Sequence, residues 1–79
     1  MTVALGIDTG GTYTDAVLVD HDSGQVLSGA KALTTYHDLS LGIGQAVAAA
    51  FEGAAVAPSD VALVALSSTL ATNAIVEGR

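Results

Sequence analysis

A glycine- and threonine-rich stretch lies between two apolar runs near the start of this chain, and it limits what the chain can fold into. The first run is Val3-Ala4-Leu5-Gly6-Ile7, the second is Ala16-Val17-Leu18-Val19, and Asp8-Thr9-Gly10-Gly11-Thr12 follows the first. Short apolar runs bounded by glycine are typical of buried strands. The pattern therefore predicts a strand, a tight turn and a second strand, with an acid where the first strand ends.

The chemistry of this turn suits the phosphates of a nucleotide. Glycines without a Cβ let the backbone approach an anion closely, and threonine hydroxyls and free N–H groups can donate to phosphate oxygens. Asp8 can hold Mg²⁺ directly or through water, because this ion prefers oxygen ligands and keeps several waters. We therefore predict half of a phosphate site, with Asp8 as the metal-binding residue. The other candidate binding residues are Thr9, Gly10, Gly11, Thr12, Thr14 and Asp15.

The remaining sequence predicts an α/β domain with the element order β-β-β-α-β-α. Polar residues at 21–24 indicate a hairpin turn, and Asp38 or Ser40 can cap a helix that Gly53 can end. That helix is small and apolar nearly all round, which predicts burial on more than one side. The expected strands are 2–8, 13–20, 25–33 and 61–66, and the expected helices are 39–53 and 70–77.

A right-handed crossover through the first helix would place the fourth strand parallel to the first, in a mixed sheet of order 3-2-1-4. Ligands of such sheets bind at the carboxyl ends of the strands where the strand order reverses. The Asp8–Thr12 stretch and the serine- and threonine-rich residues 67–69 would then meet at one edge. The fourth strand is apolar throughout, so we expect it to be covered on both faces.

The serine- and threonine-rich residues 67–69 are most simply interpreted as a turn and a helix N-terminus. Ser67, Ser68 or Thr69 can accept hydrogen bonds from the first-turn amides. Thr72 and Asn73 are poor helix formers, and a helix N-terminus is a natural anion site. We add Ser68, Thr69, Thr72 and Asn73 to the candidate binding residues.

The first motif is also compatible with other structures. Asp8-Thr9-Gly10-Gly11-Thr12 also fits a plain hairpin turn with a solvated aspartate, and its first three residues match the Asp-Thr-Gly of dimeric retroviral aspartic proteases. Such proteases are nearly all-β and have alanine or serine where Gly11 stands. A P-loop is excluded because the chain has no Gly-Lys-Ser/Thr. His21 and His37, each beside aspartate, are expected to be solvated turn residues.

The charge and composition of the chain limit the classes of partner that it can bind. The net charge is −6, with Lys31 and Arg79 as the only basic side chains, which argues against nucleic acid and anionic membranes. There is no cysteine, and no apolar run reaches the length of a membrane span. We expect a soluble, cytoplasmic protein. Its 79 residues are 51% apolar, more than so small a core can use, which favours a fragment of a larger protein over an oligomer of small subunits.

The two motifs together resemble the N-terminal region of the hydantoinase/oxoprolinase family. They are Gly6-Ile7-Asp8-Thr9-Gly10-Gly11-Thr12-Tyr13-Thr14-Asp15 and Ser68-Thr69-Leu70-Ala71-Thr72-Asn73-Ala74-Ile75-Val76-Glu77. That family contains ATP-dependent hydantoinases, 5-oxoprolinases and acetone carboxylase subunits, and it belongs to the superfamily of actin, sugar kinases and heat-shock ATPases. The resemblance implies part of a ribonuclease H-like (actin-like ATPase) subdomain over residues 1–79.

By this resemblance ATP and Mg²⁺ are the cofactors, and Asp8 is the catalytic residue beside the metal. The parent would hydrolyse a small cyclic amide after ATP phosphorylates the amide oxygen. Many members have His-Gly-Thr-Thr where this chain has Leu66-Ser67-Ser68-Thr69, so no role of that histidine carries over. A fragment of a small-molecule kinase or other actin-like ATPase, and a non-catalytic interaction module, are the alternatives.

The resemblance also implies that part of the fold is missing. The superfamily has a fifth strand beside the fourth, and its members run to several hundred residues. Without that strand, Val61–Leu66 would be an apolar edge that can pair with another chain. We expect this chain alone to be inactive and to dimerise through that edge.

Overall fold

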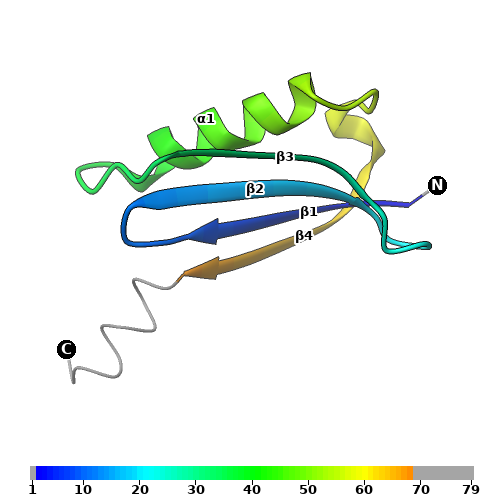
Figure 1. The fold of residues 1–79 in the computed structure, drawn as a ribbon, viewed down its shortest axis with the longest axis horizontal. Coiled ribbons are helices and arrows are strands. Elements are labelled where there is room, and N and C mark those ends of the chain that lie inside the picture. Colours follow the sequence, from blue (N-terminus) through cyan, green and yellow to red (C-terminus); the bar gives the residue numbers. More distant parts are fainter. Residues whose placement is uncertain (1, 69–79) are drawn as a thin grey trace.

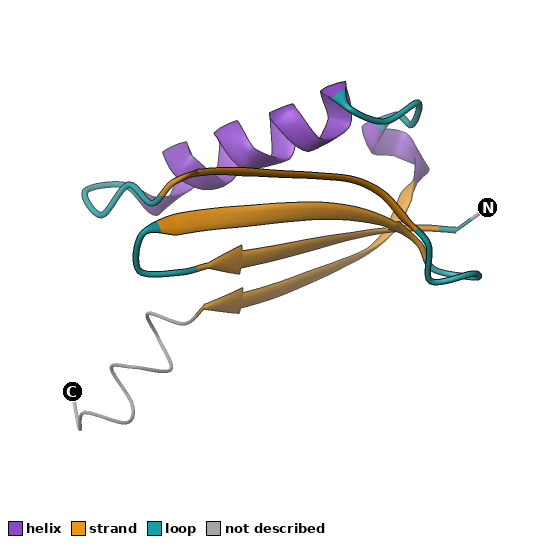
Figure 2. Ribbon diagram, in the orientation of Figure 1, coloured by secondary structure: helices purple, strands orange, loops and turns teal. Residues whose placement is uncertain are grey.

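The computed structural model describes residues 2–68, which form one mixed sheet with a long helix on one of its faces (Figures 1 and 2). Figure 1 shows α1 lying along β3 and β2, with β4 at the far side of the sheet. The strands are β1 (Val3–Thr9), β2 (Tyr13–Asp20), β3 (Val26–Leu33) and β4 (Val61–Ser68). The helices are α1 (Leu39–Glu52) and the short 3₁₀ helix η1 (Pro58–Asp60).

The strand order is β3-β2-β1-β4, as the sequence predicts. β2 is antiparallel to both β1 and β3, whereas β4 is parallel to β1. The predicted hairpin turn is also present: the Gly24 N–H donates to the Asp20 carbonyl at 2.7 Å, and Gly24 has a φ of +75° that favours glycine. The parallel pair places the carboxyl ends of β1 and β4 side by side.

The core lies between α1 and the half of the sheet that α1 covers. Leu18, Val3 and Ala16 from the strands and Ala46 and Ala50 from α1 are almost completely buried. Small side chains let the helix approach the sheet closely. Gly42 shows how closely, because a Cβ built on it would lie 2.7 Å from the carbonyl oxygen of Leu33.

Asp38 begins α1 as its N-cap. Its carboxylate oxygen Oδ1 accepts from the Ser40 hydroxyl at 2.6 Å and from the Ser40 N–H at 3.1 Å. These two hydrogen bonds hold the pKa of the Asp38 carboxyl below its ordinary value, because they favour the charged form. Gly53 follows as the C-cap, so both predicted helix ends are confirmed.

Three expectations need correction within residues 2–68. Ser67 and Ser68 continue β4 instead of forming a turn, because they pair in register with Asp8 and Thr9. α1 is buried on one side only, with Ala48 and Ala49 exposed. β4 is not covered on both faces either, because α1 reaches mainly β2 and β3. The predicted helix 70–77 lies outside the described residues.

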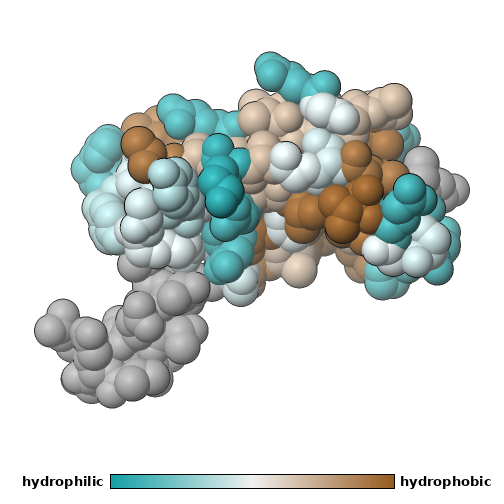
Figure 3. Space-filling model, viewed as in Figure 1, coloured by the Kyte–Doolittle hydropathy of each residue, from teal (hydrophilic) through white to brown (hydrophobic). Residues whose placement is uncertain are grey.

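The uncovered strand leaves large apolar side chains at the surface, and Figure 3 shows hydrophobic residues exposed beside hydrophilic ones. Val64 and Leu66 are 65% and 67% exposed, and Leu63 is 47% exposed. Successive side chains of a strand point to opposite faces. β4 therefore presents apolar groups on both of its faces and has a free edge in the described part of the chain.

Candidate functional site: a glycine loop beside a row of polar side chains

The loop between β1 and β2 is tight, and it depends on glycine. The Gly10 N–H donates to the carbonyl oxygen of Tyr13 at 3.0 Å. A Cβ at Gly10 would lie 2.9 Å from that same oxygen, closer than real Cβ atoms come. At Gly11 the nearest atom to such a Cβ is the Tyr36 hydroxyl at 3.8 Å, which is ordinary contact. Gly10 is therefore needed for the turn itself, whereas Gly11 leaves its backbone open to a ligand.

The segment that follows β3 holds the loop in place. The Thr34 N–H donates to the Thr12 carbonyl at 2.8 Å, and the Thr34 hydroxyl donates to the Gly10 carbonyl at 2.8 Å. The Tyr36 hydroxyl donates to the Gly11 carbonyl. No local pattern in the sequence reveals these contacts, because they join residues that are more than 20 positions apart.

These bonds use the loop's carbonyls and leave most of its donors free. Among residues 2–68 no partner is found for the N–H groups of Gly11 and Thr12. The Thr12 side chain is exposed as well. Adjacent free N–H groups in a turn make a site that attracts anions.

Thr9 and Thr14 lie on the other side of the sheet from the candidate site. Both are buried against the side that α1 covers, and the Thr14 hydroxyl lies 3.1 Å from that of Thr34. Their side chains therefore pack on the face of the sheet that α1 covers, and they do not reach the open face. We leave both out of the proposed ligand contacts.

A row of polar side chains crosses the open face of the sheet just before the loop. The register pairs Lys31 of β3 with Asp15 of β2, Asp15 with Asp8 of β1, and Asp8 with Ser67 of β4. Directly paired residues point to the same face. The Ser67 hydroxyl donates to Asp8 Oδ1 at 3.1 Å, and Lys31 Nζ lies 4.0 Å from Asp15 Oδ1. Four strands thus bring together residues that are far apart in the sequence.

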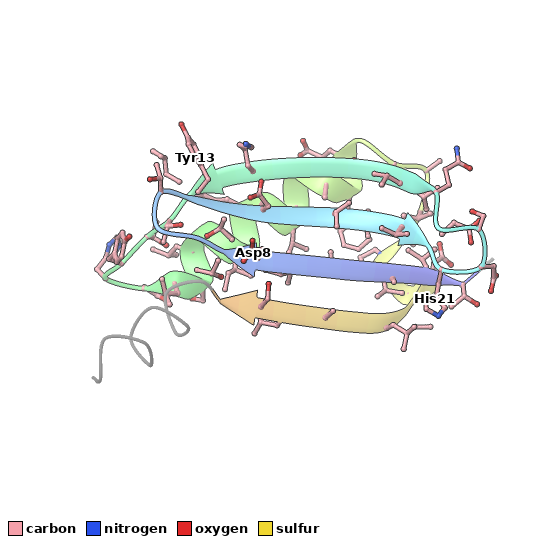
Figure 4. The ribbon with its side chains drawn as sticks, turned by 60° about the horizontal axis from the view of Figure 1, so that its bottom comes forward. Asp8, Tyr13 and His21 are labelled. Carbon is pink, nitrogen blue, oxygen red and sulfur yellow. The ribbon has the colours of Figure 1, made fainter. Side chains whose placement is uncertain are left out.

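A hollow of about 260 Å³ opens at the centre of this row. Asp8, Asp15 and Ser67 supply its polar groups, and Gly6 leaves room because a Cβ there would meet Val17 Cγ1 at 3.1 Å. Figure 4 shows Asp8 at the end of β1 near the strand end of β4. The full lining is Gly6, Ile7, Asp8, Asp15, Val17, Ala65, Leu66 and Ser67.

The donor set fits Mg²⁺ in part. Asp8 and Asp15 present carboxylate oxygens to one hollow, and like charges directly opposite each other are unfavourable unless a cation shares them. No group of three or more acidic or histidine side chains with metal-binding geometry occurs in residues 2–68. Mg²⁺ commonly uses one or two carboxylates together with water and substrate phosphates, so a site completed by phosphate oxygens suits it.

The other candidates are placed as follows. Ser68 ends β4 and pairs with Thr9 of β1, while Thr69, Thr72 and Asn73 lie outside the described residues. His21 lies at the opposite end of the sheet from Tyr13 and the loop (Figure 4). His21 therefore takes no part in a site at the loop, whereas His37 directly follows Tyr36, which contacts the loop.

A family model for the "Hydantoinase/oxoprolinase N-terminal region" matches residues 4–79, nearly the whole chain. This chain belongs to that family. The caprolactamase subunit alpha of Pseudomonas jessenii is 36% identical over an alignment of 77 residues, and the alignment covers 92% of this chain and 11% of the relative. The chain thus spans about a tenth of the length of this relative. The predicted family is confirmed.

Two solved proteins share the fold. Component A of the (R)-2-hydroxyglutaryl-CoA dehydratase of Acidaminococcus fermentans matches with a TM-score of 0.74 at 19% identity, over 99% of this chain and 28% of its own. The diol dehydratase-reactivating factor, in nucleotide-free form, matches with a TM-score of 0.70 at 30% identity, over 84% of this chain and 12% of its own. Both have the actin-like ATPase fold, which confirms the predicted fold class.

The topology of the sheet separates this chain from the protease alternative. A sheet with a parallel β1–β4 pair and a helical crossover differs from the nearly all-β fold of retroviral aspartic proteases.

Over the part of the chain that the structure describes, no helix has the length and apolar character to cross a membrane.

Proposed function

We propose that this chain supplies the first phosphate-binding loop of an ATP-dependent enzyme that hydrolyses a cyclic amide. The observation that carries the proposal is the placement of Asp8 and the free N–H groups of Gly11 and Thr12 at the carboxyl end of β1, beside that of β4. The strand order reverses between these two strands, and ligands of open α/β sheets bind at such a point.

The relatives support both halves of this proposal. Caprolactamase is by its name an enzyme that acts on a cyclic amide, and its alpha subunit is 36% identical to this chain. The solved diol dehydratase-reactivating factor is described as a nucleotide-free form, which fits a nucleotide site on this fold. We infer a small cyclic lactam or imide as the substrate class, and ATP with Mg²⁺ as the cofactors.

Each group of the site has a distinct part in this proposal. Asp8, held by the Ser67 hydroxyl, would anchor Mg²⁺, and the N–H groups of Gly11 and Thr12 would donate to phosphate oxygens. Asp15 would be a second carboxylate near Mg²⁺, and the Thr12 hydroxyl would donate to a phosphate oxygen. When bound, ATP supplies a phosphoryl group to the amide oxygen, which makes the ring carbon electrophilic toward water. The residues of this chain position the phosphates for that transfer.

The test is an ATP requirement for ring opening by the full-length protein. Purified protein is incubated with a panel of cyclic amides, with and without MgATP, and the opened product and released phosphate are quantified together. We expect ring opening only with MgATP, and about one phosphate per ring opened. Ring opening at the same rate without ATP would contradict the proposal.

A small-molecule kinase or another actin-like ATPase is the second candidate, because both solved matches share this fold and neither is named as an amide hydrolase. The same assay separates the two. A kinase would consume ATP and yield a phosphorylated product without free phosphate or an opened ring.

A further inference from the structure

The polar row on the open face contains one residue that the proposed site does not yet use. Lys31 of β3 is the only lysine or arginine within residues 2–68, and it stands at the end of the row beside Asp15. The sequence alone does not predict this placement, because Lys31 lies 16 residues after Asp15 and is paired with it only through the β2–β3 register.

The ammonium group of Lys31 leans toward the glycine loop. Its Nζ lies 5.2 Å from the centre of the Tyr13 ring, and Tyr13 is the first residue of β2 after the loop. Tyr13 is two residues nearer the loop than Asp15, the direct partner of Lys31. The ammonium therefore lies within reach of both Asp15 and the Tyr13 ring, on the face of the sheet where the hollow opens.

The charges around the hollow call for a cation from the protein. Asp8 and Asp15 are both negative, and the loop itself has no basic residue. One N–H of the loop, that of Gly10, is already bonded to Tyr13. A polyphosphate would meet two carboxylates and few donors, and a lysine ammonium is a common point-charge partner for phosphate.

We propose that Lys31 is a further phosphate-binding residue, which supplies from β3 the positive charge that the glycine loop lacks. This inference rests on the proposed function, because it assigns Lys31 to the same phosphates. Neighbouring strands lie about 4.8 Å apart, so β3 is roughly 10 Å from β1. The flexible lysine side chain spans part of that sideways distance, toward a phosphate bound beside the hollow.

A purely structural ion pair explains the placement less well. The Lys31 and Asp15 side chains are 63% and 54% exposed, and their atoms are 4.0 Å apart. Exposed pairs of this kind contribute little to folding because water and salt screen them. Because this ion pair is weak, the Lys31 side chain can turn toward a phosphate when one is present.

The experiment compares MgATP and adenosine binding to the full-length protein and its variants by calorimetry, with adenosine measured by competition. Lys31→Gln removes the charge, Lys31→Arg keeps it, and Gln45→Glu is the matched control. Gln45 is exposed on α1, on the other side of the sheet, and its substitution changes the net charge by the same one unit.

We expect Lys31→Gln to weaken MgATP binding by about 10- to 100-fold, as for the loss of a charged hydrogen bond, and to leave adenosine binding unchanged. Lys31→Arg should recover most of the affinity, and Gln45→Glu should bind as the parent does. A structural role would instead lower the affinity for both ligands or for neither.

Two results would overturn the inference, and they are distinguishable. If the parent binds MgATP, Asp8→Asn abolishes that binding and Lys31→Gln leaves the ratio of MgATP to adenosine affinity unchanged, the role of Lys31 is wrong and the proposed function stands. If the parent binds no MgATP at all, the proposed function and the role of Lys31 both fall.

Discussion

At the scale of single residues, the proposed phosphate loop depends on contacts from a segment that carries no motif. The Thr34 hydroxyl donates to the Gly10 carbonyl at 2.8 Å and lies 3.1 Å from the buried Thr14 hydroxyl. One side chain thus joins the loop, β2 and the end of β3. These bonds hold the Gly10 carbonyl, while the N–H groups of Gly11 and Thr12 have no partner within residues 2–68.

Thr34→Val tests that support. Valine keeps the shape of threonine but leaves the Gly10 carbonyl and the Thr14 hydroxyl without a partner, which should lower the free energy of unfolding by about 1–3 kcal/mol. Thermal and urea unfolding measure the change. Thr2→Val is the control, because the Thr2 hydroxyl makes no hydrogen bond to the described residues. Equal stability of both variants would show that Thr34 does not hold the loop.

At the scale of elements, the distance between α1 and β3 is set by a glycine. A Cβ at Gly42 would lie 2.7 Å from the Leu33 carbonyl and 3.2 Å from the Thr35 hydroxyl, whereas one at Gly44 would meet nothing within 4 Å. The two glycines are in the same helix and differ only in what they face. They therefore separate packing from helix propensity.

We expect opposite effects from the two alanine substitutions. Gly42→Ala should force α1 away from β3 and lower the free energy of unfolding by about 1–3 kcal/mol. Gly44→Ala should raise it by up to about 1 kcal/mol, because alanine is the better helix former. Urea unfolding midpoints of the two variants measure this difference. A stabilising Gly42→Ala would mean that the helix is not held this close to the sheet.

The elements also show what a sequence can and cannot predict. The strand, turn and helix positions follow local patterns, so β2 is predicted with its observed bounds, and the strand order follows from one crossover rule. The polarity of Ser67 and Ser68 suggests a turn, but pairing with β1 keeps both in β4. Tertiary pairing overrides local preference there.

The same reason explains which site residues the sequence misses. Asp8, Gly10 and Gly11 are predicted from one local motif, and the structure places them at the open end of β1. Lys31, Thr34 and Tyr36 join the site only through strand register and loop contacts. Thr9 and Thr14 belong to the motif, yet strand alternation turns them to the buried side.

At the scale of the whole molecule, β4 presents an apolar edge that is unpaired within residues 2–68. Val64 and Leu66 are 65% and 67% exposed, and β4 is the last strand of the described sheet. An edge strand with apolar side chains and unpaired backbone groups is a template for another strand. By family resemblance, a fifth strand would take this place in a longer chain.

We therefore predict that the 79-residue chain self-associates through β4. Sedimentation velocity over a range of concentrations should show dimers or larger species. Leu66→Lys should shift the chain toward monomer, because a charge on an edge opposes pairing. Leu41→Lys is the control, since Leu41 is 47% exposed but lies on α1. A chain that stays monomeric at high concentration would contradict the prediction.

The central claim concerns the whole protein, and the role of Asp8 in binding MgATP tests it most directly. Calorimetry on the full-length protein compares the parent with Asp8→Asn and with Glu52→Gln, an identical loss of one negative charge on the exposed end of α1. Replacing a residue that only hydrogen-bonds to a metal ligand typically lowers metal affinity by about 10–100-fold, and Asp8 is proposed to be the ligand itself. We therefore expect Asp8→Asn to weaken MgATP binding by about 100-fold or more, and Glu52→Gln to leave it unchanged. MgATP binding by Asp8→Asn that equals the parent's would contradict the assignment of this loop as the phosphate site.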